Sequence, residues 1–191
     1  AEDTLKLMQT IPLDNIATER MNNEFRRYFL GEYLYDTLDG FKYLFGQRYY
    51  FNQLDLVPQN PIYHPEGNAW LHTKEAVKVG MEVFKNESDD TRFIGLTSLL
   101  FHDIGKICKL TKEKITHEKL SSRYFLKFAN EITSKKSDIK LINNCILFHM
   151  QPRNIDKMTA EEILLILKTF KEDLPIFLKV TTADICCRYA S

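Results

Sequence analysis

The chain has 191 residues, of which 44% are hydrophobic and 27% are charged. This length is typical of one domain, or of one domain with a helical extension, and no apolar run approaches the roughly 18 to 20 residues that span a bilayer. The 26 basic and 26 acidic residues cancel, so the whole chain lacks the positive charge of proteins that wrap nucleic acid. The composition excludes disorder, a membrane span and a fibrous repeat, and it leaves only local contact with nucleic acid.

Glycine and proline are too scarce for an all-β fold with many turns, since the chain has 7 and 6 of them. We predict an all-α fold with helices at residues 16–30, 33–45, 68–84, 91–104, 117–132, 137–150, 159–170 and 173–189. The Pro-rich segment 57–67 separates an N-terminal helical extension, residues 1–56, from a main helical domain, residues 57–191.

Local signals at the predicted helix ends support these boundaries. Asn68 and Ser137 are expected to cap the N-termini of their helices, and Pro152 and Pro175 lie at helix ends. Gly105 is expected to provide a left-handed exit from the helix before it.

Six ionisable side chains lie on or beside the apolar faces of these helices, whereas His64 lies in the Pro-flanked loop. Helical spacing places the six with Ala, Val, Leu, Ile, Phe and Cys neighbours, and they are His72, His102, Asp103, His117, His149 and Asp184. The helix that carries Asp184 is also expected to bury Leu174 and Leu178.

Two inward aspartates need cations or protons, because burying an ionised carboxylate costs several kcal/mol, roughly, even after relaxation. Imidazoles together with carboxylates suit Zn, Mn, Fe, Co or Ni, with Mg as a further option, in a site of one or two ions. The absence of thiolates from the set argues against a structural zinc site. Water bound to such a metal loses its proton near neutral pH, so the set predicts metal-assisted hydrolysis.

Taken singly, these residues have simpler explanations. A histidine on an apolar face usually donates a hydrogen bond to a carbonyl group, and Asp103 can cap a neighbouring turn. Asp184 can pair with Arg188 one turn later, and Glu118 can serve either the helix dipole or His117. The convergence of the whole set favours a metal site.

The same residues form a recognisable motif. His72, the His102-Asp103 doublet and the late Asp184 resemble the H…HD…D signature of HD-domain metal-dependent phosphohydrolases. The stretches HPEGNAWLHT at 64–73 and FHDIGK at 101–106, with THE at 116–118 and FHM at 148–150, resemble the HD domain of bacterial CCA-adding enzymes. The resemblance spans residues 64–188, and IATERM at 16–21 is weakly similar to the helical neck that precedes the domain there.

The resemblance implies an HD-domain helical bundle in which His72, His102, Asp103 and Asp184 hold a metal. His117 and His149 are candidates for a second metal or for substrate phosphate. Lys106 is expected to act in catalysis beside Asp103 and to bind phosphate, and further candidate phosphate ligands are Lys109, Lys112, Lys114 and Arg123. A solvated surface run is the alternative for the lysines.

Nothing in the chain resembles the nucleotidyltransferase head of CCA-adding enzymes, so the resemblance implies only their hydrolytic half. We predict a phosphohydrolase of a small nucleotide or phosphate ester, with a 2′,3′-cyclic nucleotide as the best candidate and an RNA 3′ end as another. The alternatives are a nucleotide triphosphohydrolase, a di-iron oxygenase and a non-catalytic nucleotide- or RNA-binding module. That module would stack bases on the N-terminal aromatics Tyr28, Phe29, Tyr33, Tyr35, Phe41 and Tyr43, whose helical spacing favours a core.

Features that the sequence lacks predict the compartment of the protein and the redox state of its cysteines. The N-terminus has no charged-then-apolar signal pattern, and the 4 cysteines form neither a CxxC pair nor a spaced disulfide framework. We therefore expect a reduced protein of the cytoplasm. The chain begins without Met and ends shortly after Asp184, so the sequence is compatible with either a small free-standing protein or a part of a longer one. The sequence does not indicate an oligomeric state.

Overall fold

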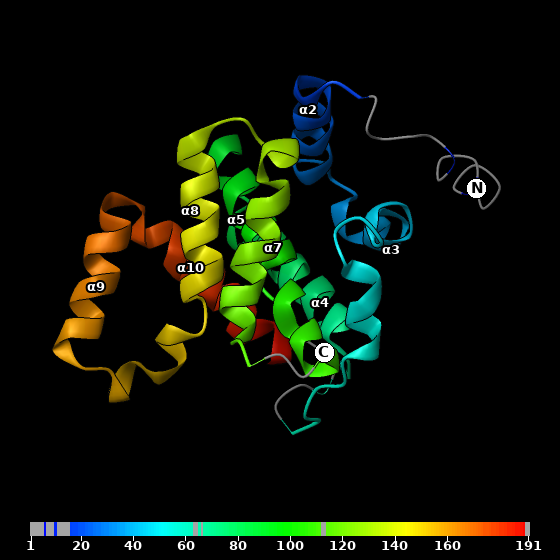
Figure 1. The fold of residues 1–191 in the computed structure, drawn as a ribbon. Helices are drawn as coiled ribbons and strands as arrows, with labels where there is room; N and C mark the ends of the chain where they lie inside the picture. The colour runs from blue at the N-terminus through cyan, green and yellow to red at the C-terminus, as the bar shows by residue number, and fades with distance from the viewer. Residues whose placement is uncertain are drawn as a thin grey trace.

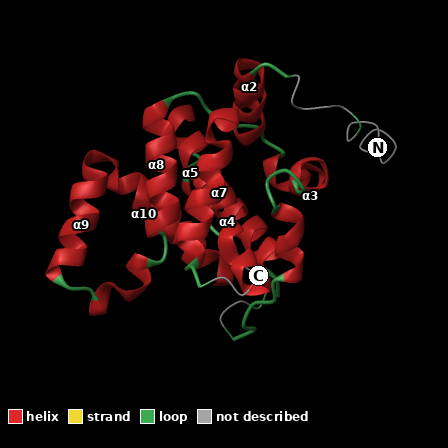
Figure 2. Cartoon of the chain, in the orientation of Figure 1, coloured by secondary structure: helices red, strands yellow, loops and turns green. Residues whose placement is uncertain are grey.

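Figure 1 shows the computed structural model, which describes residues 6, 10, 16–62, 65, 67–111 and 114–189. In these ranges the regular elements are helices (Figure 2), and the one strand-like pairing is an isolated bridge between Pro58 and Asn68. The predicted all-α class is confirmed. Among the same residues, no helix is long and apolar enough to cross a membrane.

The helices follow the predicted order along the chain. The α-helices are α2 (Thr18–Phe29), α3 (Leu34–Phe45), α4 (Ala69–Val83), α5 (Asp89–Phe101), α6 (Cys108–Thr111), α7 (His117–Ile132), α8 (Lys136–Phe148), α9 (Ala160–Phe170) and α10 (Leu174–Cys186). Short 3-10 helices join them: η2 (Phe51–Leu56), η3 (Ile104–Ile107), η4 (Gln151–Lys157), η5 (Lys171–Asp173) and η6 (Cys187–Tyr189).

Helix α5 lies at the centre of the bundle. Its residues from Phe93 to Phe101 are all buried, as expected of a helix that is apolar on every side. It packs against α2, α4, α8 and α10, and Figure 1 shows it surrounded by neighbouring helices. The end of this helix, where His102 and Asp103 follow, therefore lies inside the protein.

The N-terminal helices pack against the bundle through aromatic side chains. Phe29 and Phe41 are 1% and 4% exposed, and the ring of Tyr28 stacks on that of Phe41 with centroids 5.0 Å apart. The hydroxyl of Tyr49 donates a hydrogen bond to Glu131 Oε2 of α7 at 2.6 Å. The predicted core role is confirmed for Phe29 and Phe41. The division of the chain at residue 57 stays a prediction.

The aromatic positions near the surface differ from these. Tyr33 and Tyr43 are 66% and 43% exposed, and Tyr35 is half-buried with its hydroxyl bonded to Glu75 Oε1. Tyr35 packs against the core cluster that contains Phe29 and Phe41, whereas Tyr33 and Tyr43 are exposed.

Two predicted helix ends are confirmed, and two are wrong. Asn68 caps α4 by accepting a hydrogen bond from the backbone N–H of Leu71, and Pro175 lies in the first turn of α10. Ser137 lies inside α8, because that helix begins one residue earlier, and its hydroxyl donates to Asp138 Oδ1. Gly105 has no left-handed backbone, since Gly67 is the only glycine of the described ranges with positive φ. Gly105 instead lies within η3.

The size of Gly105 matters because η3 packs directly against α7. A Cβ atom at Gly105 would lie 2.1 Å from the carbonyl oxygen of His117 and 2.4 Å from the backbone nitrogen of Ser121. The N–H of Gly105 donates to the hydroxyl of Ser121 at 2.8 Å. The absent side chain therefore lets the segment after Asp103 approach the start of α7.

We predict opposite effects for two glycine substitutions. Gly105→Ala should lower the free energy of unfolding by about 1 to 3 kcal/mol, because the new methyl group overlaps backbone atoms that cannot move independently. Gly40→Ala, in α3, meets nothing within 4 Å and should raise it by about 0.5 to 1 kcal/mol. Urea unfolding of both variants measures the difference. Equal stability of Gly105→Ala and the wild type would contradict the packing described here.

Candidate metal centre and adjoining cavity

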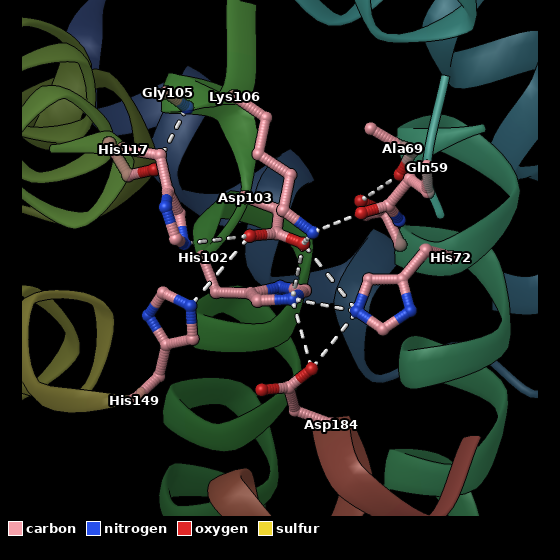
Figure 3. Close-up of polar contacts among 12 residues, drawn as sticks. Gln59, Ala69, His72, His102, Asp103, Gly105, Lys106, His117, His149 and Asp184 are labelled. Atoms are coloured by element: carbon pink, nitrogen blue, oxygen red, sulfur yellow. Dashed lines mark hydrogen bonds and ion pairs between the residues drawn. The ribbon is translucent and has the colours of Figure 1, made fainter. Parts of the chain in front are cut away.

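Four buried side chains from three parts of the chain meet in the bundle, as Figure 3 shows. Helix α4 carries His72, the end of α5 carries His102 and Asp103, and α10 carries Asp184. Each is at most 1% exposed. The inward orientation predicted for these four residues is therefore confirmed. The helix of Asp184 is less buried than expected, because Leu178 is 46% exposed while Leu174 is half-buried.

His72, His102 and Asp103 have the spacing of a metal-ligand group, and Asp184 faces both imidazoles of that group. His72 Nε2 lies 3.0 Å from Asp184 Oδ1 and 3.5 Å from Asp103 Oδ2. His102 Nε2 lies 3.2 Å from Asp103 Oδ2 and 3.5 Å from Asp184 Oδ1, and the two Nε2 atoms are 3.4 Å apart. Ligands about 2.1 Å from a tetrahedral zinc ion stand roughly 3.4 Å from one another. The donor atoms thus have the separations of a metal-ligand set.

Backbone hydrogen bonds fix the orientation of two imidazoles. His102 Nδ1 donates to the carbonyl of Leu99 at 2.7 Å, and His149 Nδ1 donates to that of Ile146 at 2.7 Å. These are the carbonyl contacts expected of ordinary core histidines. They also leave each Nε2 without its proton in the neutral ring, facing a carboxylate. A lone pair facing a carboxylate requires a proton or a metal between them. The hydrogen bond from Nδ1 to a backbone carbonyl is the usual second contact of a metal-bound histidine.

The electrostatics of the cluster favour a cation. Burial alone raises the pKa of Asp103, but the charges of His102 and Lys106 outweigh it and hold that pKa well below its usual value. For Asp184, burial is outweighed in the same way by His102 and Arg153. Burial lowers the pKa of His102, yet Asp103 and Asp184 together raise it to about 10. The two carboxylates therefore stay ionised and attract positive charge.

Asp103 also faces a second pair of histidines. Its Oδ1 atom lies 3.5 Å from His117 Nε2 and 3.7 Å from His149 Nε2, while Oδ2 faces the first set. Burial lowers the pKa of His117 to about 4 against the attraction of Asp103, so this imidazole is neutral at physiological pH. Asp103, His117 and His149 have the spacing of a second ligand group, with Asp103 shared between the two.

A buried thiol lies behind His72 and was missed by the sequence analysis. Cys187 Sγ is 3.5 Å from His72 Nδ1 and 3.2 Å from the carbonyl oxygen of Asp184. His72, Asp184 and Cys187 form a further group with metal-ligand spacing. The thiol lies at the Nδ1 side of the imidazole, whereas Nε2 faces the carboxylates. One ion therefore cannot use both the thiol side and the carboxylate side of His72.

A cavity of about 310 Å³ adjoins the cluster. It is lined by Gln59, Asn60, Lys106, Lys109, His117, Met150, Arg153 and Arg188. Among the residues that the structure describes, the charged side chains of the lining are lysines and arginines. This arrangement suits an anionic ligand that reaches the metal site from the cavity.

Lys106 belongs to the centre and is not a surface lysine. It is 6% exposed, and its Nζ lies 2.5 Å from Asp103 Oδ2 and 2.5 Å from Gln59 Oε1. Lys109 is exposed at the cavity, whereas Lys114 and Arg123 are exposed and do not line it. His64 and Lys112 lie outside the described residues.

Two arginines of the cavity were not recognised as site residues from the sequence. Arg153, in η4, places Nη2 2.5 Å from Asp184 Oδ2. The arginine that pairs with Asp184 is therefore Arg153, whereas the simple local explanation expected Arg188. Glu118 Oε2 lies 3.7 Å from His117 Nδ1, on the side of that ring opposite to Asp103.

The fold and the site together define an all-α protein with a buried His/Asp cluster that has the donors and spacing to bind a metal ion. The chain is 33% identical over 127 residues to the Multifunctional CCA protein of Acinetobacter baumannii strain SDF. The matched region covers 61% of this chain and 29% of that protein. The chain is 30% identical over 113 residues to the Multifunctional CCA protein of Acinetobacter baylyi, covering 56% and 26%. The chain therefore spans less than a third of the length of these relatives. No family model and no solved structure matches it.

Removing the shared carboxylate should remove the metal. We expect Asp103→Ala to lose bound metal, because Asp103 supplies a charged oxygen to both ligand groups, while its circular dichroism remains helical. Asp36→Ala, an exposed aspartate in the first turn of α3, is the matched control. Elemental analysis after reconstitution with Mn²⁺, Co²⁺, Ni²⁺ or Zn²⁺ measures occupancy. A wild-type protein that retains none of these metals would refute the metal site.

Proposed function

We propose that this protein is an HD-type metal-dependent phosphohydrolase that acts on a small phosphate ester, with a 2′,3′-cyclic nucleotide as the best candidate substrate. The observation that carries the proposal is the position of the buried His/Asp cluster beside a cavity at which the described charged side chains are lysines and arginines. The similarity to Multifunctional CCA proteins supports a nucleotide- or RNA-related substrate.

In this proposal His72, His102, Asp103 and Asp184 hold the metal. A divalent cation bound there would lower the pKa of a water ligand, to about 7 in the case of zinc, and would so supply a nucleophile for hydrolysis. Because the Nδ1–H of His102 donates to the carbonyl of Leu99, Nε2 is the nitrogen that would bind the metal, in place of a proton. Arg153 holds the other oxygen of Asp184 and thereby fixes the direction of that carboxylate.

Lys106 is proposed to balance the negative charge of the reacting phosphate. Its ammonium group stands between Asp103 and the cavity, held by Gln59. A preorganised charge at this position is most effective in a site that excludes water. His117 lines the same cavity and is neutral, so it is better suited to ligate a second cation than to attract phosphate by charge.

The size of the cavity supports a compact substrate. Its volume of about 310 Å³ is at the lower end of the range for small-molecule sites, roughly 300 to 1,000 Å³. The zero net charge of the chain supports a small ligand over extended RNA, although a single RNA 3′ end carries the same chemistry. The substrate assay is designed to distinguish this function from those of a triphosphohydrolase, a di-iron oxygenase and a binding module.

The second histidine pair should affect turnover more than metal retention. We expect His117→Ala and His149→Ala each to keep one metal ion and to hydrolyse substrate more slowly, because neither belongs to the first ligand set. Metal stoichiometry distinguishes their roles, since a fall from two ions to one assigns them to a second ion. Complete loss of metal from either variant would show that the first set is misassigned.

The substrate assay uses 2′,3′-cyclic AMP, 3′,5′-cyclic AMP, para-nitrophenyl phosphate and deoxynucleoside mono- and triphosphates with Mn²⁺, Co²⁺, Ni²⁺ or Mg²⁺. We expect hydrolysis of the 2′,3′-cyclic nucleotide. Lys106→Ala should be slower by about 10² to 10³-fold, the usual cost of removing one preorganised group, with metal occupancy undiminished. Lys119→Ala, an exposed lysine of α7, is the control.

Two results of this assay, and one result of a separate oxygen-uptake measurement on iron-loaded protein, would contradict the proposal. Activity on triphosphates alone would make the protein a triphosphohydrolase. Inactivity of the metal-loaded protein on the whole panel would favour a binding module. Oxygen consumption by an iron-loaded protein that leaves every ester intact would indicate an oxygenase.

A further inference from the structure

Several hydrogen-bond donors at the cavity have no acceptor. Gln59 Nε2, Arg153 Nε and both Nε and Nη2 of Arg188 are buried atoms without a hydrogen-bond partner among the described residues. All three side chains line the same cavity. Buried donors in native proteins are rarely left unpaired. Their grouping at one cavity indicates that an acceptor belongs there.

Arg188 presents the geometry that selects an oxyanion. Its Nε and Nη2 lie on one edge of the planar guanidinium, and this edge can donate two parallel hydrogen bonds to two oxygens of one phosphate or carboxylate group. The nearest acidic residue along the helix, Asp184, is already bound by Arg153 through its Oδ2. Among the described residues no acceptor bonds Nε or Nη2 of Arg188, so this edge can receive a ligand.

The charges around the cavity specify the kind of ligand. Arg188, Arg153, Lys106 and Lys109 contribute positive charge, and none of the described lining residues is a carboxylate that would offset it. The unpaired donors come from three side chains, so a group with several acceptor oxygens satisfies them better than a monatomic anion such as chloride. A tetrahedral phosphate group has both the charge and the oxygens.

We propose that Arg188, Arg153 and Gln59 form an oxyanion subsite that binds a phosphate group beside the metal centre and does so without a metal. The inference rests on the proposed function in one respect, because it takes the phosphate to be that of the substrate or product. Arg153 connects the two sites, since its Nη2 binds Asp184 while its Nε is unpaired in a side chain that lines the cavity.

The test is binding of inorganic phosphate to the full chain after removal of metal with EDTA, measured by isothermal titration calorimetry at physiological ionic strength. We expect the wild type to bind phosphate and Arg188→Gln to bind it about 10- to 100-fold more weakly. Arg188→Lys keeps the charge but lacks the two-nitrogen edge, so its affinity should fall between the two. Arg27→Gln, at an exposed arginine of α2, should bind like the wild type.

Circular dichroism is used to check that each variant is folded. If Arg188→Gln does not fold, the comparison of Arg188→Lys with the wild type provides the test. The subsite is refuted if the metal-free wild type does not bind phosphate. It is also refuted if Arg188→Lys binds as tightly as the wild type, or if Arg27→Gln weakens binding as much as Arg188→Gln. These results would show diffuse attraction by positive charge.

The outcome is separable from that of the hydrolase assay. Phosphate binding that depends on the Arg188 edge, in a protein that hydrolyses no ester with any metal, would support the subsite and contradict the hydrolase. Ester hydrolysis by a protein whose metal-free form does not bind phosphate would contradict the subsite and leave the hydrolase standing.

Discussion

Two ionised carboxylates buried in a helical bundle set the requirements for everything around them. Asp103 and Asp184 are 1% and 0% exposed, and burying a charge costs several kcal/mol, roughly, unless it is paired and hydrogen-bonded. Lys106 pairs with one and Arg153 with the other, and both lie 2.5 Å from a carboxylate oxygen. The other oxygen of Asp184 faces the imidazoles of His72 and His102. The oxygen of Asp103 that binds Lys106 also faces these two imidazoles, and its second oxygen faces His117 and His149. A metal ion among these nitrogens would complete the compensation.

The packing of the helices determines where those charges meet. Helix α5 is enclosed by its neighbours and delivers His102 and Asp103 to the interior, while α4 and α10 pack on it and on each other and bring His72 and Asp184. Gly105 allows the next segment to lie against α7, so His117 reaches the second oxygen of Asp103. The site is thus held by the core of the bundle, and the cavity beside it connects it to the ligand.

The sequence predicted the parts of this arrangement that depend on local pattern. Helical periodicity indicated that His72 and Asp184 point inward, and the order of the motif indicated that they belong together with His102 and Asp103. It did not indicate Arg153 or Gln59, because η4 and the loop after η2 have no regular spacing and reach the site only through tertiary packing. Arg123 fits the pattern of a phosphate ligand locally, yet it lies exposed and away from the cavity lining.

The most direct test of the central claim is X-ray absorption spectroscopy of the protein loaded with zinc. A first shell of nitrogen and oxygen alone, with the outer-shell scattering of two imidazoles, is predicted for an ion held by His72, His102, Asp103 and Asp184. A sulfur ligand at about 2.3 Å would instead place the ion at Cys187 with His72 and Asp184, and it would contradict the account.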